Sequence, residues 1–284
     1  MHEMVERYAL SRDITTGSVE QLDFAIRSFG KFLTRQPVAD DFRDDTINRF
    51  ILWLVSEGFA HETVRSRRRA LLTLWRADAE DDLLPPPRKV RRVKPRRVLP
   101  RAWTEGQVDA ILAQCDTLRG RFRRHPAIER RAFARAYVLA AYESGFRRSD
   151  LLRIRRPQIP PSGLIVLVQS KTGNVHLARI RPETIVAIDT MGTAGRENVF
   201  GGVVSNRRLC RMFTAIFQAA GMPEGTMKWL RRSGATHVEK ETPGAGWRFL
   251  GHTSDRVAKA SYIDPTQVAA APFVPPQLGR KRKT

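Results

Sequence analysis

Six residues in the second half of the chain have side chains suited to attack on a phosphodiester. They comprise two arginines, two lysines, a histidine and a late tyrosine: Arg147, Lys171, Lys228, Arg231, His252 and Tyr262. Cleavage of a phosphodiester builds negative charge on the phosphoryl oxygens, and a planar guanidinium can hold two of these oxygens at once. Fixed cations could therefore replace the metal ions that many phosphoryl-transfer enzymes use. The residue types predict metal-independent cleavage of nucleic acid.

Four of these residues have a definite part in such a reaction. Arg147 and Arg231 are the predicted phosphate clamp. An ordinary tyrosine has a pKa near about 10, so cationic surroundings must favour the phenolate of Tyr262 before it can attack. The attack would leave a covalent phosphotyrosine that stores the bond for religation, so neither ATP nor another cofactor is expected. Lys171 is the predicted general acid for the leaving oxygen, and the alternative is an ordinary exposed turn lysine.

The remaining two residues are expected to contact the phosphate. Lys228 can donate a hydrogen bond to a phosphate oxygen, but it could serve as a base only if its pKa were depressed. His252 is a predicted hydrogen-bond donor to the phosphate, and the alternative is a histidine that caps a helix or packs in the core. Asp150, three residues after Arg147, is expected either to orient the clamp, to cap its helix or to have a plain structural role.

The charge balance indicates a polyanionic partner. The chain has 284 residues, with 50 Lys and Arg against 29 Asp and Glu, and a net charge of +21. Residues 1–87 have 12 basic and 15 acidic side chains, whereas residues 88–101 have eight basic side chains and none that is acidic. A surface that only needs to be soluble usually mixes its charges, so we expect double-stranded DNA as the partner. The alternative is a solvated charged surface.

Periodicity and composition predict two domains. Residues 1–84 contain three segments with apolar residues at helical spacing, which indicates a small helical bundle. Residues 85–101 are rich in proline, lysine and arginine, and we expect an interdomain linker because proline lacks a donor and like charges repel. Residues 102–284 predict a mainly α domain with a small antiparallel β-sheet.

Local signals place the elements of the second domain. Helices are expected at about 104–115, 128–144, 181–191, 205–219, 226–240 and 254–261. Thr104 and Gln107 resemble a capping box, and Gly145 is a natural helix stop. The apolar runs 164–168 and 175–180 flank a turn around Lys171, which predicts a β-hairpin.

Two further groups of basic residues are predicted to bind DNA. One is the third helix of the first domain, where four arginines in five residues repel one another unless a polyanion lies nearby. The alternative there is a solvated helix face. The other group is the basic linker. The predicted contacts are Arg65, Arg67, Arg68, Arg69, Arg88, Lys89, Arg91, Arg92 and Lys94.

Signals for other compartments and for metals are absent from the sequence. Cys115 and Cys210 stand apart without CxxC spacing and are expected to be reduced and mostly structural. Neither they nor the histidines show metal-ligand spacing, so no metal site is predicted. The chain has no apolar N-terminal signal and no run of about 18 uncharged apolar residues. We expect a cytoplasmic, nucleoid-associated protein in a prokaryotic or viral context.

The order of the motifs resembles the tyrosine recombinase, or phage-type integrase, family over nearly the whole chain. The segment 145–151 is similar to the first arginine box of the family, and Lys171 lies at the position of its hairpin lysine. The segment 230–236 is similar to the second arginine box, and Leu250, Gly251 and His252 precede Tyr262 at nearly the usual interval.

The chain departs from the family pattern at two places. Lys228 stands where the family usually has histidine. The interval from His252 to Tyr262 is one residue longer than usual, while the preceding segment with residues 242–246 is slightly compressed. Both departures bear on whether the site is active.

The resemblance implies a site-specific DNA recombinase that cleaves and rejoins DNA through a 3′-phosphotyrosine, in the integration or excision of a mobile element. Residues 1–84 would be the core-binding domain and residues 102–284 the catalytic domain, arranged as a clamp on duplex DNA. The free protein would be a monomer or dimer, and a tetramer would form on two DNA sites. An accessory DNA-bending protein is compatible with this interpretation.

The C-terminal segment has two short runs of distinct composition. The apolar run 268–274 suits docking on a neighbouring protomer, and the basic run 280–283 suits a phosphate-binding or disordered tail.

Two alternative functions are compatible with the same residues. A type IB topoisomerase, which has a related catalytic fold, is one of them. The other is a catalytically silent DNA-binding protein, favoured by Lys228 and by the spacing of Tyr262.

Overall fold

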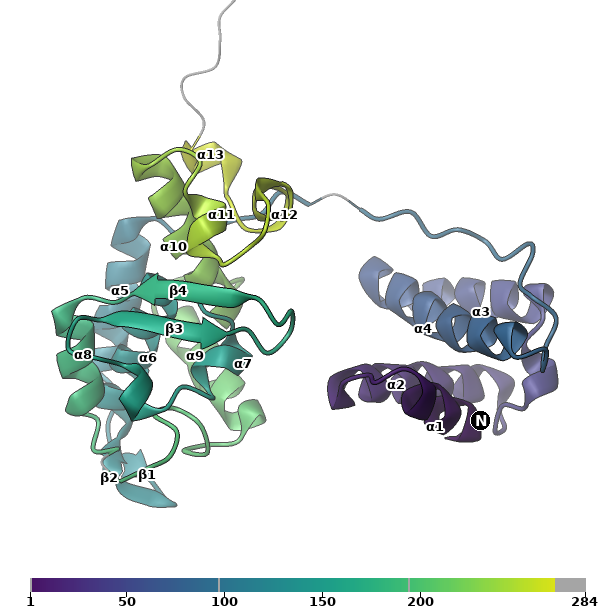
Figure 1. Ribbon diagram of the computed structural model, residues 1–284, viewed down its shortest axis with the longest axis horizontal. Helices are drawn as coiled ribbons and strands as arrows, with labels where there is room; N and C mark the ends of the chain where they lie inside the picture. Colours follow the sequence, from purple (N-terminus) through teal and green to yellow (C-terminus); the bar gives the residue numbers. More distant parts are fainter. Residues whose placement is uncertain (1, 97, 194, 269–284) are drawn as a thin grey trace, which may run out of the picture. The chain divides into compact units, whose positions relative to one another are not determined.

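The computed structural model describes residues 2–96, 98–193 and 195–268. The chain divides into two compact units, of which the first ends at Val98 and the second begins at Leu99 (Figure 1). This boundary lies within the predicted linker. Each unit has a hydrophobic core of its own.

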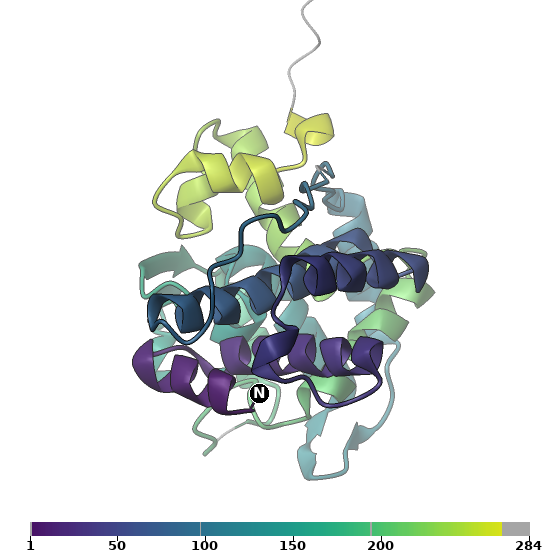
Figure 2. The ribbon, with the colours of Figure 1, turned by 90° about the vertical axis from the view of Figure 1, so that its right-hand side faces the viewer.

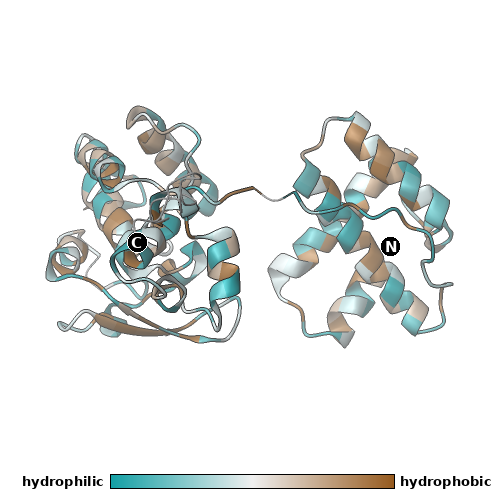
Figure 3. Ribbon diagram, turned by 90° about the horizontal axis from the view of Figure 1, so that it is seen from above, coloured by the Kyte–Doolittle hydropathy of each residue, from teal (hydrophilic) through white to brown (hydrophobic). Residues whose placement is uncertain are grey.

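The first unit is a bundle of four helices (Figure 2). They are α1 (His2–Ser11), α2 (Thr16–Leu33), α3 (Asp44–Ser56) and α4 (His61–Glu80), with a 3-10 turn at Ala39–Asp41 before α3. Hydrophobic and hydrophilic residues both occur on the helices of this unit (Figure 3), as expected of amphipathic helices that bury one face. Three of the helices were predicted from their apolar spacing, and α1 was not. Aromatic rings pack together in the core of this unit, where Phe29 lies edge-on against Phe42 and Phe50.

Residues 85–93 differ from the expected free linker because they are fastened to the first unit. The carboxylate of Asp44 accepts two backbone N–H groups of this segment, at 3.1 and 2.9 Å. The amide of Asn48 accepts from the backbone N–H of Arg91 at 2.7 Å, and Nε of Arg68 donates to the carbonyl of Arg91 at 2.6 Å. The segment is neither helix nor strand, as predicted, but side chains of α3 and α4 satisfy its backbone.

The second unit is mainly helical, with two small antiparallel sheets of two strands each among the described residues. This confirms the predicted fold class. Its elements are α5 (Glu105–Asp116), β1 (Arg121–Phe122), β2 (His125–Glu129), α6 (Arg130–Ser144), α7 (Arg148–Leu151), a 3-10 turn (Arg156–Gln158), β3 (Leu164–Val168), β4 (Val175–Arg179), α8 (Pro182–Asp189), α9 (Asn206–Ala219), α10 (Met227–Glu241), α11 (Gly246–Phe249), α12 (Asp255–Ser261) and α13 (Pro265–Val268).

Helix α6 is the central helix of the second unit. It lies behind the β3–β4 hairpin in Figure 1 and contacts α5, α8 and α10. It ends at Gly145, whose φ of +61° is left-handed. A Cβ at this position would lie 2.5 Å from the ring of Phe249, so the close approach also requires glycine. The predicted stop is confirmed.

The predicted start of this helix at residue 128 is wrong. Residues His125–Glu129 form β2, which pairs antiparallel with β1. Proline lacks a donor for a helix interior, and Pro126 therefore favours the extended segment before α6. Ile128 lies in this strand and is buried. A buried apolar residue at this position fits a helix and a strand equally well.

The predicted hairpin is confirmed. Strands β3 and β4 pair in register from Leu164 opposite Arg179 to Val168 opposite Val175, and Lys171 lies in the turn. Alternate residues of both strands are buried, and one of these inward positions on β4 holds His176. A polar side chain on the inner face requires partners for its nitrogens.

The remaining predicted elements hold with ends that differ by one or two residues. The capping box before α5 is present, with Thr104 accepting from the Gln107 N–H at 3.3 Å and its own N–H bonded to Gln107 at 2.9 Å. Helices α7, α11 and α13 were not predicted, since four residues are too few to show a helical period. No described helix is long and apolar enough to span a membrane. The expectations for residues 268–274 and 280–283 fall almost wholly outside the described residues.

Candidate active site

Separate elements of the second unit supply the six predicted residues. Arg147 precedes α7, Lys171 lies in the β3–β4 turn, Lys228 and Arg231 lie in the first turns of α10, His252 follows α11, and Tyr262 follows α12. Lys228 and Arg231 are three residues apart and therefore share one face of α10. The last helices, α10 to α13, gather at one end of the unit (Figure 1).

Three of the six surround the ring of Tyr262. The Arg231 guanidinium carbon lies 5.1 Å from the ring centroid and Nζ of Lys228 lies 4.9 Å from it. The His252 ring meets the tyrosine edge-on, with 5.2 Å between the ring centroids. The structure thus brings together, within one chain, residues that are far apart in the sequence.

Arg231 is held in place by backbone carbonyls. Its side chain is buried, with 3% of the residue exposed. The guanidinium donates to the carbonyl of Gly145 and, through Nη2, to that of Leu250 at 2.9 Å. A buried charge needs hydrogen-bond partners, and neutral carbonyls supply them without neutralising the charge. Because Gly145 belongs to the first arginine box, this contact also joins the two boxes.

Arg147 and the hairpin turn are fastened by two neighbouring contacts. Nη1 of Arg147 donates to the side-chain oxygen of Gln169 at 2.5 Å. Asp150 is buried, and its Oδ1 accepts from the backbone N–H and the hydroxyl of Ser170, at 2.9 and 2.6 Å. Asp150 therefore fixes the residue that precedes Lys171. This part was not among the roles expected for Asp150, because the sequence does not show which segment faces it.

The cations favour the phenolate of Tyr262. Burial opposes ionisation of the phenol, but attraction by Arg231, Lys228 and Arg147 exceeds this effect and lowers the pKa of Tyr262. The pKa of Lys228 is also lowered, by desolvation and by repulsion from Arg232, Lys171 and Arg231, against attraction by Tyr262. Lys171 itself is exposed in the β3–β4 turn. The two lowered pKa values belong to interacting groups that titrate together.

His252 is neutral near pH 7. Burial and the positive charges of Arg231 and Arg147 lower its pKa to about 4. Nη2 of Arg231 lies 3.3 Å from Nε2 of His252. Because a guanidinium can only donate, Nε2 accepts and the proton resides on Nδ1. Nδ1 is buried and has no partner among the described residues.

The unusual spacing before Tyr262 is accommodated by polar contacts with α10. The buried carboxylate of Glu239 accepts from the N–H groups of Gly244 and Gly246, at 3.0 and 2.8 Å, and closes the compressed loop. Nε of Arg232 donates to the carbonyl of Ser261 at 3.1 Å, beside the tyrosine. These contacts hold both the compressed loop and the segment just before Tyr262 against α10.

Two buried residues of the site were missed by the sequence analysis. Gln169 and His176, which are 1% and 0% exposed, connect the hairpin with Arg147 and with the turn after α11. The available signal was a polar residue at an inward position of β4 and another directly after the apolar strand β3. Its meaning depends on partners more than 70 residues away in the sequence.

The predicted DNA contacts of the first unit have mixed surroundings. Arg65 pairs with Glu62 at 2.8 Å, Arg67 lies over the ring of Phe24, and Arg68 holds the segment after α4, whereas Arg69 is exposed. After α4, the predicted basic side chains are all exposed: Arg88, Lys89, Arg91, Arg92 and Lys94. The backbone is fastened to the first unit at Arg88, Lys89 and Arg91. Contact of either group with DNA remains a prediction.

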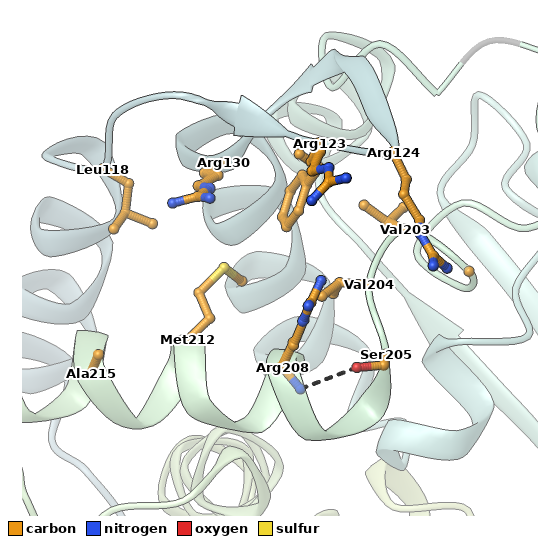
Figure 4. Close-up of a pocket in the computed structure, with 12 residues that line it drawn as sticks. Leu118, Arg123, Arg124, Arg130, Val203, Val204, Ser205, Arg208, Met212 and Ala215 are labelled. Atoms are coloured by element: carbon orange, nitrogen blue, oxygen red, sulfur yellow. Dashed lines mark hydrogen bonds between the residues drawn. The ribbon is translucent and has the colours of Figure 1, made fainter.

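A separate cavity of about 1010 Å³ lies between the β1–β2 hairpin and α9 (Figure 4). Its floor is apolar, with Phe122 and Met212 among its residues. Four arginines line its rim: Arg123, Arg124, Arg130 and Arg208. None of the six predicted residues lines this cavity. Within the described part of the chain, no group of three His, Cys, Asp or Glu is placed to hold a metal ion.

No family model matches the chain, and neither does any curated protein. Solved structures do match. A lambda integrase dimer bound to a COC′ core site has a TM-score of 0.74 and 18% identity, over 96% of this chain and 99% of that one. XerH recombinase in a post-cleavage complex with palindromic difH has a TM-score of 0.68 and 14% identity, over 90% and 79%. The Tn1549 transposon integrase with circular intermediate DNA has a TM-score of 0.63 and 13% identity, over 95% and 95%.

These likenesses establish the fold. The chain has the fold of the tyrosine recombinases, which confirms the resemblance inferred from the motifs at the level of structure. Within that class, it is similar to lambda integrase over nearly its whole described length.

Proposed function

We propose that this protein is a tyrosine recombinase that binds double-stranded DNA and cleaves and rejoins it at specific sites through a 3′-phosphotyrosine. The observation that supports this most directly is the convergence of Lys228, Arg231 and His252 on the ring of Tyr262. A buried basic cluster around a tyrosine of lowered pKa is what nucleophilic attack on a phosphodiester requires.

In the proposed reaction, the Tyr262 oxygen attacks the scissile phosphorus. A bond from phosphorus to the tyrosine oxygen forms, and the bond from phosphorus to the 5′ oxygen of the next nucleotide breaks. Lys228 contacts the phosphate and, in its neutral form, accepts the phenol proton; its lowered pKa supports this second part. Lys171 gives a proton to the departing 5′ oxygen. Rejoining is the reverse, with the 5′-hydroxyl attacking the phosphotyrosine.

The phosphate is held by the two arginines and the histidine. Arg147 and Arg231 bind the non-bridging oxygens, on which negative charge grows in the transition state. Arg231 is already fixed by the carbonyls of Gly145 and Leu250, so little reorganisation is needed as this charge develops. His252 donates from Nδ1. No metal ion takes part in this scheme, since the cations of the chain occupy the positions around the phosphate.

Binding and assembly extend the proposal beyond the cluster. The arginines of α4 and the basic side chains of residues 88–94 contact the DNA backbone, and protomers on two sites form a tetramer. Integration or excision of a mobile element is the proposed role. In the matched structures, lambda integrase is a DNA-bound dimer or a tetramer on a Holliday junction, and the Tn1549 integrase belongs to a transposon, which supports these steps.

Covalent trapping tests the proposal. A library of nicked duplexes with randomised sequence around the nick is incubated with the protein, and covalent adducts are recovered after denaturation and sequenced. We expect adducts with the wild-type chain on a restricted set of sequences. Replacement of Tyr262 by phenylalanine removes the nucleophile, so adducts fall to background while DNA affinity stays within about twofold, because the hydroxyl alone is lost.

The other outcomes separate the alternatives. Adducts that persist in the Tyr262→Phe variant contradict the nucleophile. DNA binding without adducts in the wild type identifies a silent DNA-binding protein. Relaxation of supercoiled plasmid by a monomer, without sequence preference among the adducts, identifies a topoisomerase.

A further inference from the structure

The side chain of Gln169 uses its full hydrogen-bonding capacity inside the second unit. Its oxygen accepts from Nη1 of Arg147 at 2.5 Å and from the hydroxyl of Thr172 at 2.8 Å. Its nitrogen donates to the carbonyl of Leu250 at 3.0 Å and lies 3.1 Å from Nδ1 of His176. A side-chain amide has two donors and an oxygen with two lone pairs. Each of these four possibilities has a partner.

His176 completes this arrangement in one defined protonation state. Its Nε2 lies 2.8 Å from the carbonyl of Phe249, so this nitrogen must donate. Nδ1 must then accept from the amide of Gln169, which requires a neutral ring. Burial, together with the charges of Arg231 and Arg147, lowers the pKa of His176 to about 4, although the bond to Phe249 opposes the shift. The neutral form therefore persists near pH 7.

These bonds join the two arginines of the clamp. The carbonyl of Leu250 accepts from Gln169 and also from Nη2 of Arg231 at 2.9 Å. A continuous path of hydrogen bonds therefore runs from Arg147 through Gln169 and this carbonyl to Arg231. The turn after α11 lies close against the path, because a Cβ on Gly251 would be 2.6 Å from Nε2 of Gln169.

The same residue controls the base of the hairpin turn. The backbone N–H of Gln169 donates to the carbonyl of Asn174, and its own carbonyl accepts from the N–H of Gly173, both at 2.9 Å. Lys171 follows two residues later and is exposed. The position of its ammonium group consequently depends on how Gln169 is held.

We propose that Gln169 and His176 are positioning residues for strand cleavage. They hold Arg147, the Leu250 carbonyl that receives Arg231, and the Lys171 turn as one frame, without touching the DNA. This inference rests on the function proposed above. Both residues are buried, so their loss should slow cleavage and leave DNA affinity nearly unchanged. Displacement of catalytic groups by about 1 Å can cost about 100-fold in rate.

Three variants change these bonds in different ways. Gln169→Leu keeps the approximate size and removes every side-chain hydrogen bond. Gln169→Glu keeps the acceptor for Arg147 and Thr172 and removes the donors to Leu250 and His176. His176→Phe keeps an aromatic ring against Phe146, on which the histidine packs edge-on at 4.7 Å, and removes both ring bonds.

The experiment compares covalent trapping with binding. Single-turnover adduct formation is measured at saturating protein on a nicked duplex recovered from the randomised library, and affinity is measured on the same duplex without the nick. We expect Gln169→Leu to slow adduct formation by about 100-fold and the other two variants to slow it less, each with affinity within about twofold.

A double-mutant cycle separates positioning from general destabilisation. If Gln169 acts through Arg147, then Gln169→Leu should slow the Arg147→Ala variant far less than it slows the wild type. The matched control is Tyr142→Phe, which removes a partly buried bond of this unit, the 2.6 Å contact between the Tyr142 hydroxyl and Nδ1 of His237. We expect the control to lower the melting temperature and to leave the adduct rate within about twofold.

Failure of the positioning role can be distinguished from failure of the proposed recombinase function. Absence of adducts with the wild-type chain contradicts the recombinase itself. Normal adduct rates in the Gln169 and His176 variants overturn only the positioning role. Equal slowing in both backgrounds of the cycle overturns it too, as does a rate loss in the control equal to that in Gln169→Leu. If Gln169→Leu does not fold, the cycle is carried out with Gln169→Met, which also lacks the acceptor for Arg147.

Discussion

Two arginine-rich regions of the second unit differ in how their charges are held. Around Tyr262, the Arg231 guanidinium is buried and bonded to carbonyl oxygens, and no acidic group pairs with it in the described chain. Around the cavity beside α9, arginines such as Arg123 and Arg208 are exposed and surround an apolar floor. Both regions attract anions. Only the first places fixed cations around Tyr262, the proposed nucleophile.

The comparison shows why cavity volume does not locate this site. A small substrate is bound by being enclosed, so its site is usually the best-formed pocket. A DNA duplex is too large to be enclosed, and it covers an open surface on which a few groups are fixed in advance. For such a substrate, burial and bonding of the cations indicate the site better than the cavity does.

Arg231 offers the strongest test of this comparison. Replacement by alanine removes one half of the clamp and leaves the carbonyls of Gly145 and Leu250 without their donor. Loss of a single preorganised donor to a developing oxyanion costs about 10²–10³ in rate, and loss of an arginine at a transferring phosphoryl group about 10³–10⁵. We therefore expect adduct formation to fall by about 10³ or more, measured in a single turnover at saturating protein.

Lysine at the same position sharpens the test. Arg231→Lys keeps the positive charge but cannot hold two carbonyls and a phosphate oxygen in one plane. We expect it to remain at least about 100-fold slower than wild type. A rate near wild type for the lysine variant would mean that charge alone suffices, and the distinction between the two regions would be lost.

The pH dependence of adduct formation should show a smaller effect than the Arg231 substitutions, and the direction of this effect can be predicted. Because the pKa of Tyr262 is lowered, the phenolate fraction and the rate of adduct formation should rise with pH and level off below the pH at which an ordinary tyrosine ionises. His252, with a pKa of about 4, contributes no titration between about pH 5 and 8. Lys228→Met removes one of the charges that lower the pKa of Tyr262.

The expected result for Lys228→Met is a displacement of the rising limb of the pH profile toward higher pH. If the limb moves by about one pH unit, the rate at neutral pH should fall by about tenfold, and part of the loss should be recovered at high pH. Rates are measured across a pH series with constant ionic strength. A uniform loss at every pH would assign Lys228 to phosphate contact alone.

The candidate residues could be named from the sequence, but the contacts that hold them could not. Arg147, Arg231 and Tyr262 were proposed because the chemistry of phosphodiester cleavage restricts which side chains can serve, and because their order resembles that of the family. Gln169 and His176 were missed because an inward polar residue acquires meaning only from its partners in space. The attachment of residues 85–93 to the first unit was missed for the same reason, since Asp44 and Asn48 lie about 40 residues earlier.

The fold shows the same division between local and distant information. The hairpin with Lys171 and the end of α6 at Gly145 were predicted, because apolar runs on either side of a turn and a glycine at the end of a helix are properties of adjacent residues. The strand at His125–Glu129 was not distinguished from the start of α6, because five residues with one buried position fit either period. The interaction of His252 with Arg231, and hence its tautomer, required coordinates.

The smallest expected effect concerns the arginines of the cavity. Arg123→Gln and Arg208→Gln each remove an exposed charge that makes no ion pair in the described part of the chain, and exposed substitutions of this kind usually change stability by less than about 0.5 kcal/mol. We expect single-turnover adduct formation at saturating protein to stay within about twofold of wild type.

Any loss should appear in the salt dependence of DNA binding, whose slope falls by about one for each phosphate contact removed. A tenfold loss of rate at saturation would instead connect the cavity with cleavage, because weaker binding alone cannot slow a saturated reaction. The two regions would then have to be treated as parts of one site.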